Sequence, residues 1–235
     1  MRYAPRLCIL PALACAIALN LAHGEVIYES ALPGPPTGGG YQLGWDFMLG
    51  TRFHLDSPAQ VQQVGGRMWP YGGQIFGGIF ELASPTAFPS GNPFDAAPIA
   101  LTVFTPPQST DGDFLVPLSA TLAPGDYALM FGSGRFGTSG LAIVPYNNID
   151  VPGSSCIDWN GSNTGWQDWN TEIFGALRFV VDGAVVPEPG SRTLFAVGAA
   201  LMLMHAGSRK GLAKPGHRSP AQRRVQAGAP ESKFL

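Results

Sequence analysis

The sequence predicts an all-β fold, an antiparallel β-sandwich of the jelly-roll kind, set between two apolar end segments. Short runs rich in β-branched and aromatic residues recur through the middle of the 235-residue chain, and clusters of Gly, Pro, Asn and Asp separate them. A helical period of three or four residues is absent from 25–186. Many short strands at this spacing are typical of a sandwich or a barrel. The expected strands are 26–28, 50–55, 61–68, 74–82, 99–105, 126–131, 140–144 and 172–181.

Residue alternation assigns faces within three of these strands. Apolar side chains fall on every second residue of 51–56, so His54 is expected on the solvated face. The run 74–80 is apolar on both faces and predicts a central strand, in which Gly77-Gly78 marks a bulge or a close backbone approach. In 172–181 the alternation is less regular, and Arg178 is expected to leave at an exposed face.

The N-terminal segment predicts a secretory signal peptide over 1–24. Arg2 and Arg6 precede an apolar stretch, and Ala22-His23-Gly24 places small residues at the −3 and −1 positions of a cut before Glu25. A lipoprotein cut at Cys15 is the alternative. Removal of the leader keeps only Cys156 in the mature chain, so no intramolecular disulfide is expected. Cys156 is then a small hydrophobe, a reactive thiol or an intermolecular bridge.

The charge of the chain is divided between its parts. Residues 25–186 hold four arginines and no lysine against fourteen Asp and Glu, a net charge of −10. Nucleic-acid binding needs Lys and Arg to displace counterions, so the acidic body excludes a nucleic-acid partner. After Gly207 the sign reverses, and the segment 211–235 is expected to be a basic, disordered tail.

The segment 187–210 predicts a transmembrane helix behind an extended motif. Pro187-Glu188-Pro189 follows the last expected strand, and its prolines keep it extended. Residues 193–207 are largely apolar and would form a helix of roughly 22 Å at about 1.5 Å per residue. Arg209 and Lys210 follow at once and act as stop-transfer charges on the cytoplasmic side. The body would therefore lie on the outer side.

The motif, the apolar span and the basic end together resemble the PEP-CTERM sorting signal of exported bacterial proteins. The resemblance implies that an exosortase-type enzyme in the membrane handles the chain, with Pro187, Glu188 and Pro189 as its recognition motif. Such signals often occur beside exopolysaccharide genes. Two departures are the long tail to Leu235 and His205 inside the apolar run. The body also resembles β-rich domains that often precede this signal, which implies no activity.

The body offers little for catalysis. His54 is its one histidine, and no Gly-x-Ser-x-Gly turn accompanies it. No catalytic residue and no metal ligand set is therefore assigned, and the chain is expected not to be an enzyme and to need no cofactor. Calcium is the one alternative, because hard oxygen ligands occur in loops, although without the twelve-residue loop pattern. The acidic loop residues are Asp111, Asp113, Asp150, Asp158 and Asp168.

The segment 156–170 is the candidate glycan-binding site. Trp159, Trp166 and Trp169 alternate with Asn, Asp and Gln in a Gly-rich stretch, so the rings could stack on sugars while the amides bond hydroxyls. The alternative is that the rings fold back and cap the open end of the sandwich.

The sequence thus predicts an exported, non-enzymatic protein of the cell surface or extracellular matrix. It would be anchored in the inner membrane before processing and would associate with exopolysaccharide. The alternative is a carbohydrate-active enzyme or carbohydrate-binding module that uses the Trp-rich loop. An enzyme would need two carboxylates about 5 to 10 Å apart in a cleft.

Overall fold

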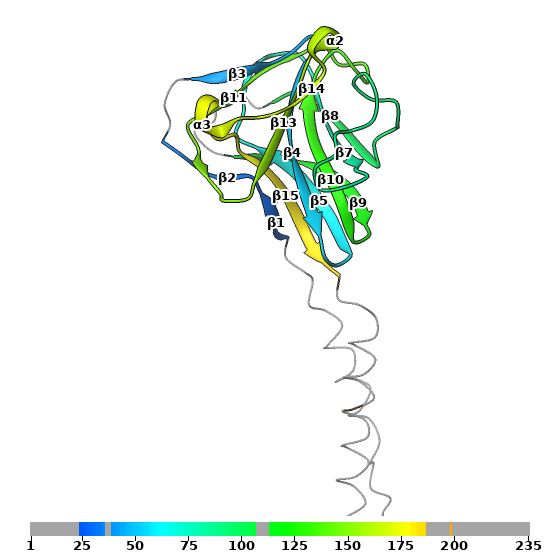
Figure 1. The fold of residues 1–235 in the computed structure, drawn as a ribbon. Coiled ribbons are helices and arrows are strands. Elements are labelled where there is room, and N and C mark those ends of the chain that lie inside the picture. Colours follow the sequence, from blue (N-terminus) through cyan, green and yellow to red (C-terminus); the bar gives the residue numbers. More distant parts are fainter. Residues whose placement is uncertain (1–23, 36–38, 107–112, 187–197, 199–235) are drawn as a thin grey trace, which may run out of the picture. The chain divides into compact units, whose positions relative to one another are not determined.

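The structure of the chain is a computed structural model that describes residues 24–35, 39–106, 113–186 and 198 (Figure 1). Residues 24–186 belong to one compact unit, Met1–Glu188. Antiparallel strands make up most of the described residues, which confirms the predicted all-β class. The short helices α2 (Gly161–Thr164) and α3 (Thr171–Phe174) interrupt them.

Two sheets form the sandwich. The four-stranded sheet has the order β1-β15-β5-β9, with β1 (Glu25–Glu29), β15 (Phe179–Val185), β5 (Ala59–Gly66) and β9 (Phe114–Leu122). The six-stranded sheet has the order β14-β13-β4-β10-β7-β8, with β14 (Trp166–Asp168), β13 (Ser155–Asn160), β4 (Phe47–Leu55), β10 (Gly125–Gly132), β7 (Ile75–Glu81) and β8 (Ala100–Phe104).

Two smaller sheets complete the described fold. One has the order β3-β11-β6, with β3 (Gly40–Leu43), β11 (Leu141–Pro145) and β6 (Trp69–Gly72). The other pairs β12 (Ile149–Asp150) with β2 (Ala31–Leu32). The predicted strands coincide with β1, β4, β5, β7, β8, β10 and β11. The prediction for 172–181 was wrong at its start, which forms α3, and right at its end, which enters β15. The strands β2, β3, β6, β9, β12, β13 and β14 were not predicted.

One apolar layer joins the two main sheets. Phe131 of β10 stacks on Phe179 of β15, with ring centroids 5.6 Å apart. At the sheet edges Phe104 of β8 meets Phe114 of β9 at 5.5 Å. Aromatic pairs at such distances add about 0.5 to 1.5 kcal/mol each beyond the area that they bury. These contacts bring strands from opposite sheets into a single core.

A second apolar cluster lies on the other face of the six-stranded sheet. Met48, Phe76 and Met130 are fully buried there. The cover comes from residues 83–99, whose Phe88 and Phe94 pack on the cluster. Both faces of this sheet are therefore apolar, which explains why strand β7 is buried throughout except at its last residue.

The glycine pair in β7 allows a close approach without a bulge. The register between β7 and β10 runs unbroken through Gly77 and Gly78. A Cβ on Gly77 would lie 2.7 Å from Cε1 of Phe131, so a larger residue would displace that core ring. The predicted central position and close approach are confirmed, while a bulge is not formed.

Arg178 is buried, contrary to the exposed position predicted from the sequence. Its Nε donates to both carboxylate oxygens of Asp113, at 2.8 and 2.7 Å, and Nη1 donates to Oε2 of Glu29 at 2.8 Å. Nη1 also donates to the carbonyl of Ala31. These acceptors replace the water that the cation loses, so the guanidinium can lie inside the fold. The cluster ties β1 to the segments that precede β9 and β15.

Arg67 is also fully buried, but neutral oxygens surround it. Its Nη1 donates to the carbonyl of Gly34 and to the amide oxygens of Asn147 and Asn148, at 3.1 to 3.3 Å. Nη2 donates to the carbonyl of Pro35 at 3.0 Å. This one side chain therefore holds the chain before β3 against the chain that follows β11.

The register places the two ends of the body together. Glu25 lies opposite Gly183, and Val185 lies opposite Ala59, so β1 begins beside the end of β15 (Figure 1). Leu55 and Gly125 pair at this same end of the domain. The other end is formed by the start of β4, the end of β10 and the turn carrying α2 (Figure 1).

The predicted end segments lie outside the described residues. These are the signal peptide up to residue 23, the motif Pro187-Glu188-Pro189, residues 193–207 apart from Gly198, the charges Arg209 and Lys210, and the tail 211–235. Among the residues that the structure describes, no helix is both long and apolar enough to cross a membrane.

Replacing Arg178 by Met should lower the free energy of unfolding by about 2 to 3 kcal/mol, because the carboxylates of Asp113 and Glu29, only 24% and 31% exposed, lose their cation. Urea denaturation measures this change. Arg135→Met is the matched control. Its ion pair with Asp46 is 3.6 Å long with both side chains 43% exposed, so the loss should stay below about 1 kcal/mol. Equal losses in the two variants would contradict a stabilising role for the buried cluster.

Candidate functional site

The three tryptophans of the predicted glycan site are used in packing. Trp159 of β13 is 3% exposed, and its Nε1–H donates to Oδ1 of Asp46 at 3.0 Å. Trp166 of β14 donates to the carbonyl of Pro93 at 3.2 Å, and Trp169 donates to the carbonyl of Gly175 at 2.8 Å. Every indole N–H of the segment is thus bonded within the protein.

The same three rings do not form one platform. Trp159 and Trp166 meet edge to face at 5.4 Å on the outer apolar cluster, whereas Trp169 packs on Tyr41 of β3 at 4.6 Å. Trp166 also lies parallel to Phe88, 6.2 Å away. The rings fold back onto the body, as the alternative expected, but Trp159 and Trp166 cover the outer face of the six-stranded sheet instead of an open end.

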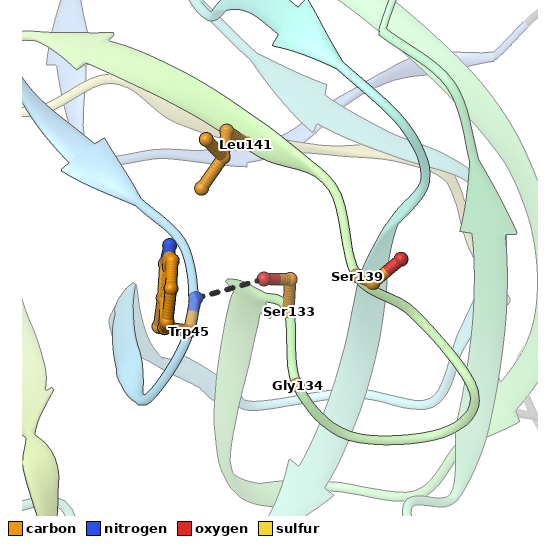
Figure 2. A pocket seen from close by; sticks show the side chains of 5 residues that line it. All are labelled: Trp45, Ser133, Gly134, Ser139 and Leu141. Carbon is orange, nitrogen blue, oxygen red and sulfur yellow. Dashed lines mark hydrogen bonds between the residues drawn. The ribbon is translucent and has the colours of Figure 1, made fainter.

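A different tryptophan, Trp45, stands at the surface. It is 80% exposed and lines a hollow of about 360 Å³ with Ser133, Gly134, Ser139 and Leu141. Figure 2 shows the indole and Leu141 on two sides of the hollow, with the loop that carries the serines opposite the ring. The volume is at the lower end of the range for small-ligand pockets, roughly 300 to 1,000 Å³.

Trp45 occupies a strained backbone position. The mutual hydrogen bonds between Gly44 and Phe47, at 3.2 and 2.9 Å, close a two-residue turn over Trp45 and Asp46. Trp45 has φ of 58°, and the φ of Asp46 is not positive, the pattern of a type II′ turn in which glycine usually takes the first central position. A bulky side chain there costs about 1 to 2 kcal/mol.

Surrounding contacts hold the turn in this conformation. The Trp45 N–H donates to Oγ of Ser133 at 3.1 Å (Figure 2). Gly134 has φ of 78°, and a Cβ there would lie 2.2 Å from the Trp45 carbonyl oxygen. Asp46 accepts from Trp159 through Oδ1 and from the Ser162 N–H through Oδ2 at 3.2 Å. These contacts hold the backbone of the turn, while the indole itself remains in solvent.

A second hollow, of about 330 Å³, contains the only histidine of the body. His54 is exposed as predicted, and its Nδ1 lies 2.7 Å from Oδ1 of Asp126 while Nε2 lies 3.3 Å from Oδ1 of Asp56. The hydrogen bond with Asp126 raises the pKa of His54. Arg52 lines the same hollow, donates to Ser155 and Asp168 at 2.8 and 2.6 Å, and packs over Phe88.

Cys156 is separated from His54 and is not reactive in this state. It shares the inner sheet face with its register partner Thr51, whereas His54 projects from the opposite face of β4. Cys156 is 2% exposed, and burial raises the pKa of its thiol to about 12. The neutral, enclosed thiol matches the small hydrophobe expected from the sequence.

The acidic residues considered for calcium are spread over several contacts. Asp113 binds Arg178, Asp168 binds Arg52, and Asp150 accepts from the Ser154 hydroxyl at 3.3 Å. Asp111 lies outside the described residues. Within the described part of the chain, no three His, Cys, Asp or Glu side chains gather as a metal ion would require.

Asp158 is a buried acid with a displaced titration. It lies on β13 opposite Leu49 and Gln167 and is 5% exposed. Desolvation, followed by the charge of Asp168, raises the pKa of Asp158 to about 6. Asp168 pairs with Ile157, so the two carboxylates project from opposite faces of the β13–β14 ribbon.

We compared the chain with protein-family models and with curated proteins. No protein-family model matches the chain, and no curated protein matches it.

Asp158 should make stability depend on pH between about 4 and 6. The folded protein binds this proton more tightly than the unfolded chain, so the stabilisation is complete below the unfolded pKa near 4 and is lost as pH rises through about 6. Asp158→Asn should remove roughly 2 to 3 kcal/mol of this dependence, measured by urea denaturation from pH 4 to 7. Glu25→Gln controls for the loss of one negative charge. An unaltered slope in Asp158→Asn would show that another group titrates.

Trp45→Gly should leave the free energy of unfolding unchanged or raise it by up to about 1 kcal/mol. Glycine adopts positive φ without strain, and little packing is lost because the indole is exposed. Trp45→Ala keeps the strain and is the matched control. Thermal unfolding of both variants measures the difference. A glycine variant that melts below the alanine variant would mean that the turn is not strained at this residue.

Proposed function

We propose that this chain is an exported, non-enzymatic protein of the cell surface or extracellular matrix, and that its jelly-roll-like β-sandwich is a binding module. Sorting would depend on Pro187-Glu188-Pro189, handled by an exosortase-type enzyme while the C-terminal helix sits in the inner membrane. This proposal rests on the resemblance of residues 187–210 to the PEP-CTERM signal and on the leader-like residues 1–24.

The pairing of β1 with β15 is the structural observation that supports it best. Glu25, the first residue after the expected cut, lies opposite Gly183, and adjacent strands are about 4.8 Å apart. The chain therefore enters and leaves the sandwich at one end. A domain built this way can emerge from a membrane, keep its anchor at one end and present the opposite end to the surroundings.

The position of the Trp45 hollow fits the same arrangement. Trp45 precedes the first residue of β4, and Ser133 follows the last residue of β10, so both lie at the end away from Glu25 and Val185. A ligand in this hollow would be bound far from the residues where the chain leaves the domain.

The enzyme alternative receives less support from the geometry. A glycosidase needs two carboxylates facing one substrate, one of them with a raised pKa. Asp158 has the raised pKa, but its neighbour Asp168 projects from the other face of the ribbon and is paired with Arg52. Neither carboxylate lines the two hollows described above.

Intact-mass analysis of the protein recovered from its native cells tests the proposal, because it fixes both termini at once. We expect the chain to begin at Glu25 and to have lost residues beyond the Pro187–Pro189 motif. Glu188→Ala should leave the C-terminal segment attached and increase the membrane-bound form, whereas Glu231→Ala in the tail should not. A full-length cytoplasmic product that still carries Met1 would overturn the proposal.

A further inference from the structure

The hollow beside Trp45 has the composition of a site for an uncharged ligand. Its described lining is one indole, one aliphatic side chain, two hydroxyls and a glycine, and no charged residue is among them. The nearby charges of Asp46 and Arg135 are directed at each other, 3.6 Å apart. An anion or a cation would find no countercharge in this lining, so a neutral molecule is the better fit.

Two exposed polar side chains lie close to the apolar lining. Ser139 is exposed, and its hydroxyl can both donate and accept. Gln42 of β3 is exposed as well, and its Nε2 lies 3.7 Å from the position of a Cβ on Gly44, which in turn abuts Leu141. The hollow thus offers an apolar face with hydroxyl and amide groups at its edge.

A second exposed aromatic residue lies on the same small sheet. Leu141 pairs with Gly72, the neighbour of Tyr71, and Tyr71 is 73% exposed. Trp45 follows β3 and Tyr71 belongs to β6, so the two residues come from the strands on either side of β11. Large aromatic side chains at the surface of a soluble domain mark contact sites when they gather.

The backbone strain at Trp45 adds a separate reason to assign function to this ring. Glycine would satisfy the turn at lower cost, yet the chain places its largest side chain there, with 80% of it in solvent. Packing within the fold cannot account for the residue. The contacts of Ser133, Gly134 and Asp46 hold the backbone of the turn, so the Cα of Trp45 stays at the rim of the hollow before any ligand arrives.

From these observations we propose that Trp45, Ser139, Leu141 and Gln42 form a binding site for one sugar ring of a neutral polysaccharide, with Tyr71 contacting the next ring. A pyranose has an apolar C–H face that packs on an indole, while its hydroxyls bond to the serine and the amide. The site replaces the Trp159, Trp166 and Trp169 segment as the glycan-binding candidate. This site adds a ligand class to the proposed function. It rests on that function only for the source of the polysaccharide, which would be the matrix around the cell.

Retention on immobilised polysaccharides tests the site. The protein recovered from its native cells is incubated with beads carrying dextran, mannan or a soluble cellulose derivative, and with beads carrying alginate as an acidic polymer. We expect retention on at least one neutral polymer and at least a fivefold smaller retained fraction for Trp45→Gly. Ile173→Ala, which alters another residue that is 70% exposed, should bind as the wild type does.

Three outcomes would overturn this site. They are equal retention of the wild type and Trp45→Gly, no retention of the wild type on any neutral polymer, and retention on alginate alone. The intact mass of each variant is measured in parallel. If Trp45→Gly is retained as the wild type is and the termini are as expected, only the binding site is refuted. If the termini are not as expected but retention depends on Trp45, the sorting proposal is refuted and the binding site stands.

Discussion

The apolar layer between the two main sheets is the constraint on which the other features depend. Strand β10 lies between β4 and β7 and faces that layer with Tyr127, Leu129 and Phe131, while Ala128 and Met130 face the other way and are buried too. A sheet that is apolar on both faces needs a second cover, because its outer face would otherwise meet water. Residues 83–99 and the tryptophans of β13 and β14 supply that cover. The Trp-rich segment is therefore committed to packing, and the free aromatic surface lies elsewhere, on the turn before β4.

Most of the few cations in the body lie inside the fold. Three of its four arginines, Arg52, Arg67 and Arg178, are at most 6% exposed. Each joins segments that are far apart in sequence: Arg52 reaches Ala87 and Asp168, and Arg178 reaches Glu29 and Asp113. Guanidinium groups suit this role because their planar fork of donors bonds several acceptors at once. The basic residues thus act inside the fold, and most of the acidic excess is left to the surface.

The topology connects the fold with the proposed export route. Pairing of β1 with β15 brings the first and last strands of the body together, so a leader at one end and an anchor at the other can leave from the same place. The long antiparallel strands β4 and β10 span the domain, and at the opposite end the turn at Trp45 meets the loop after Gly132. The end where the chain enters and leaves the domain is therefore separated from the Trp45 hollow by the length of these strands. The proposed sugar site uses the same arrangement, since its lining comes from the turn before β4, the loop after β10 and the start of β11.

The sequence by itself determined the β class, most of the strands and the face of His54, because alternation and turn residues are local properties. The sequence also contains the period-two pattern of β9, in which Pro117 is tolerated because β9 is an edge strand. The turn Gly44-Trp45-Asp46-Phe47 was not predicted, and nothing local distinguishes an exposed tryptophan from a buried one. Tertiary structure decided which tryptophans are buried, that Arg178 lies inside, and that Asp158 and Asp168 face apart. These depend on contacts between residues tens of positions apart, and sequence spacing carries no information about which distant groups will remove a side chain from water.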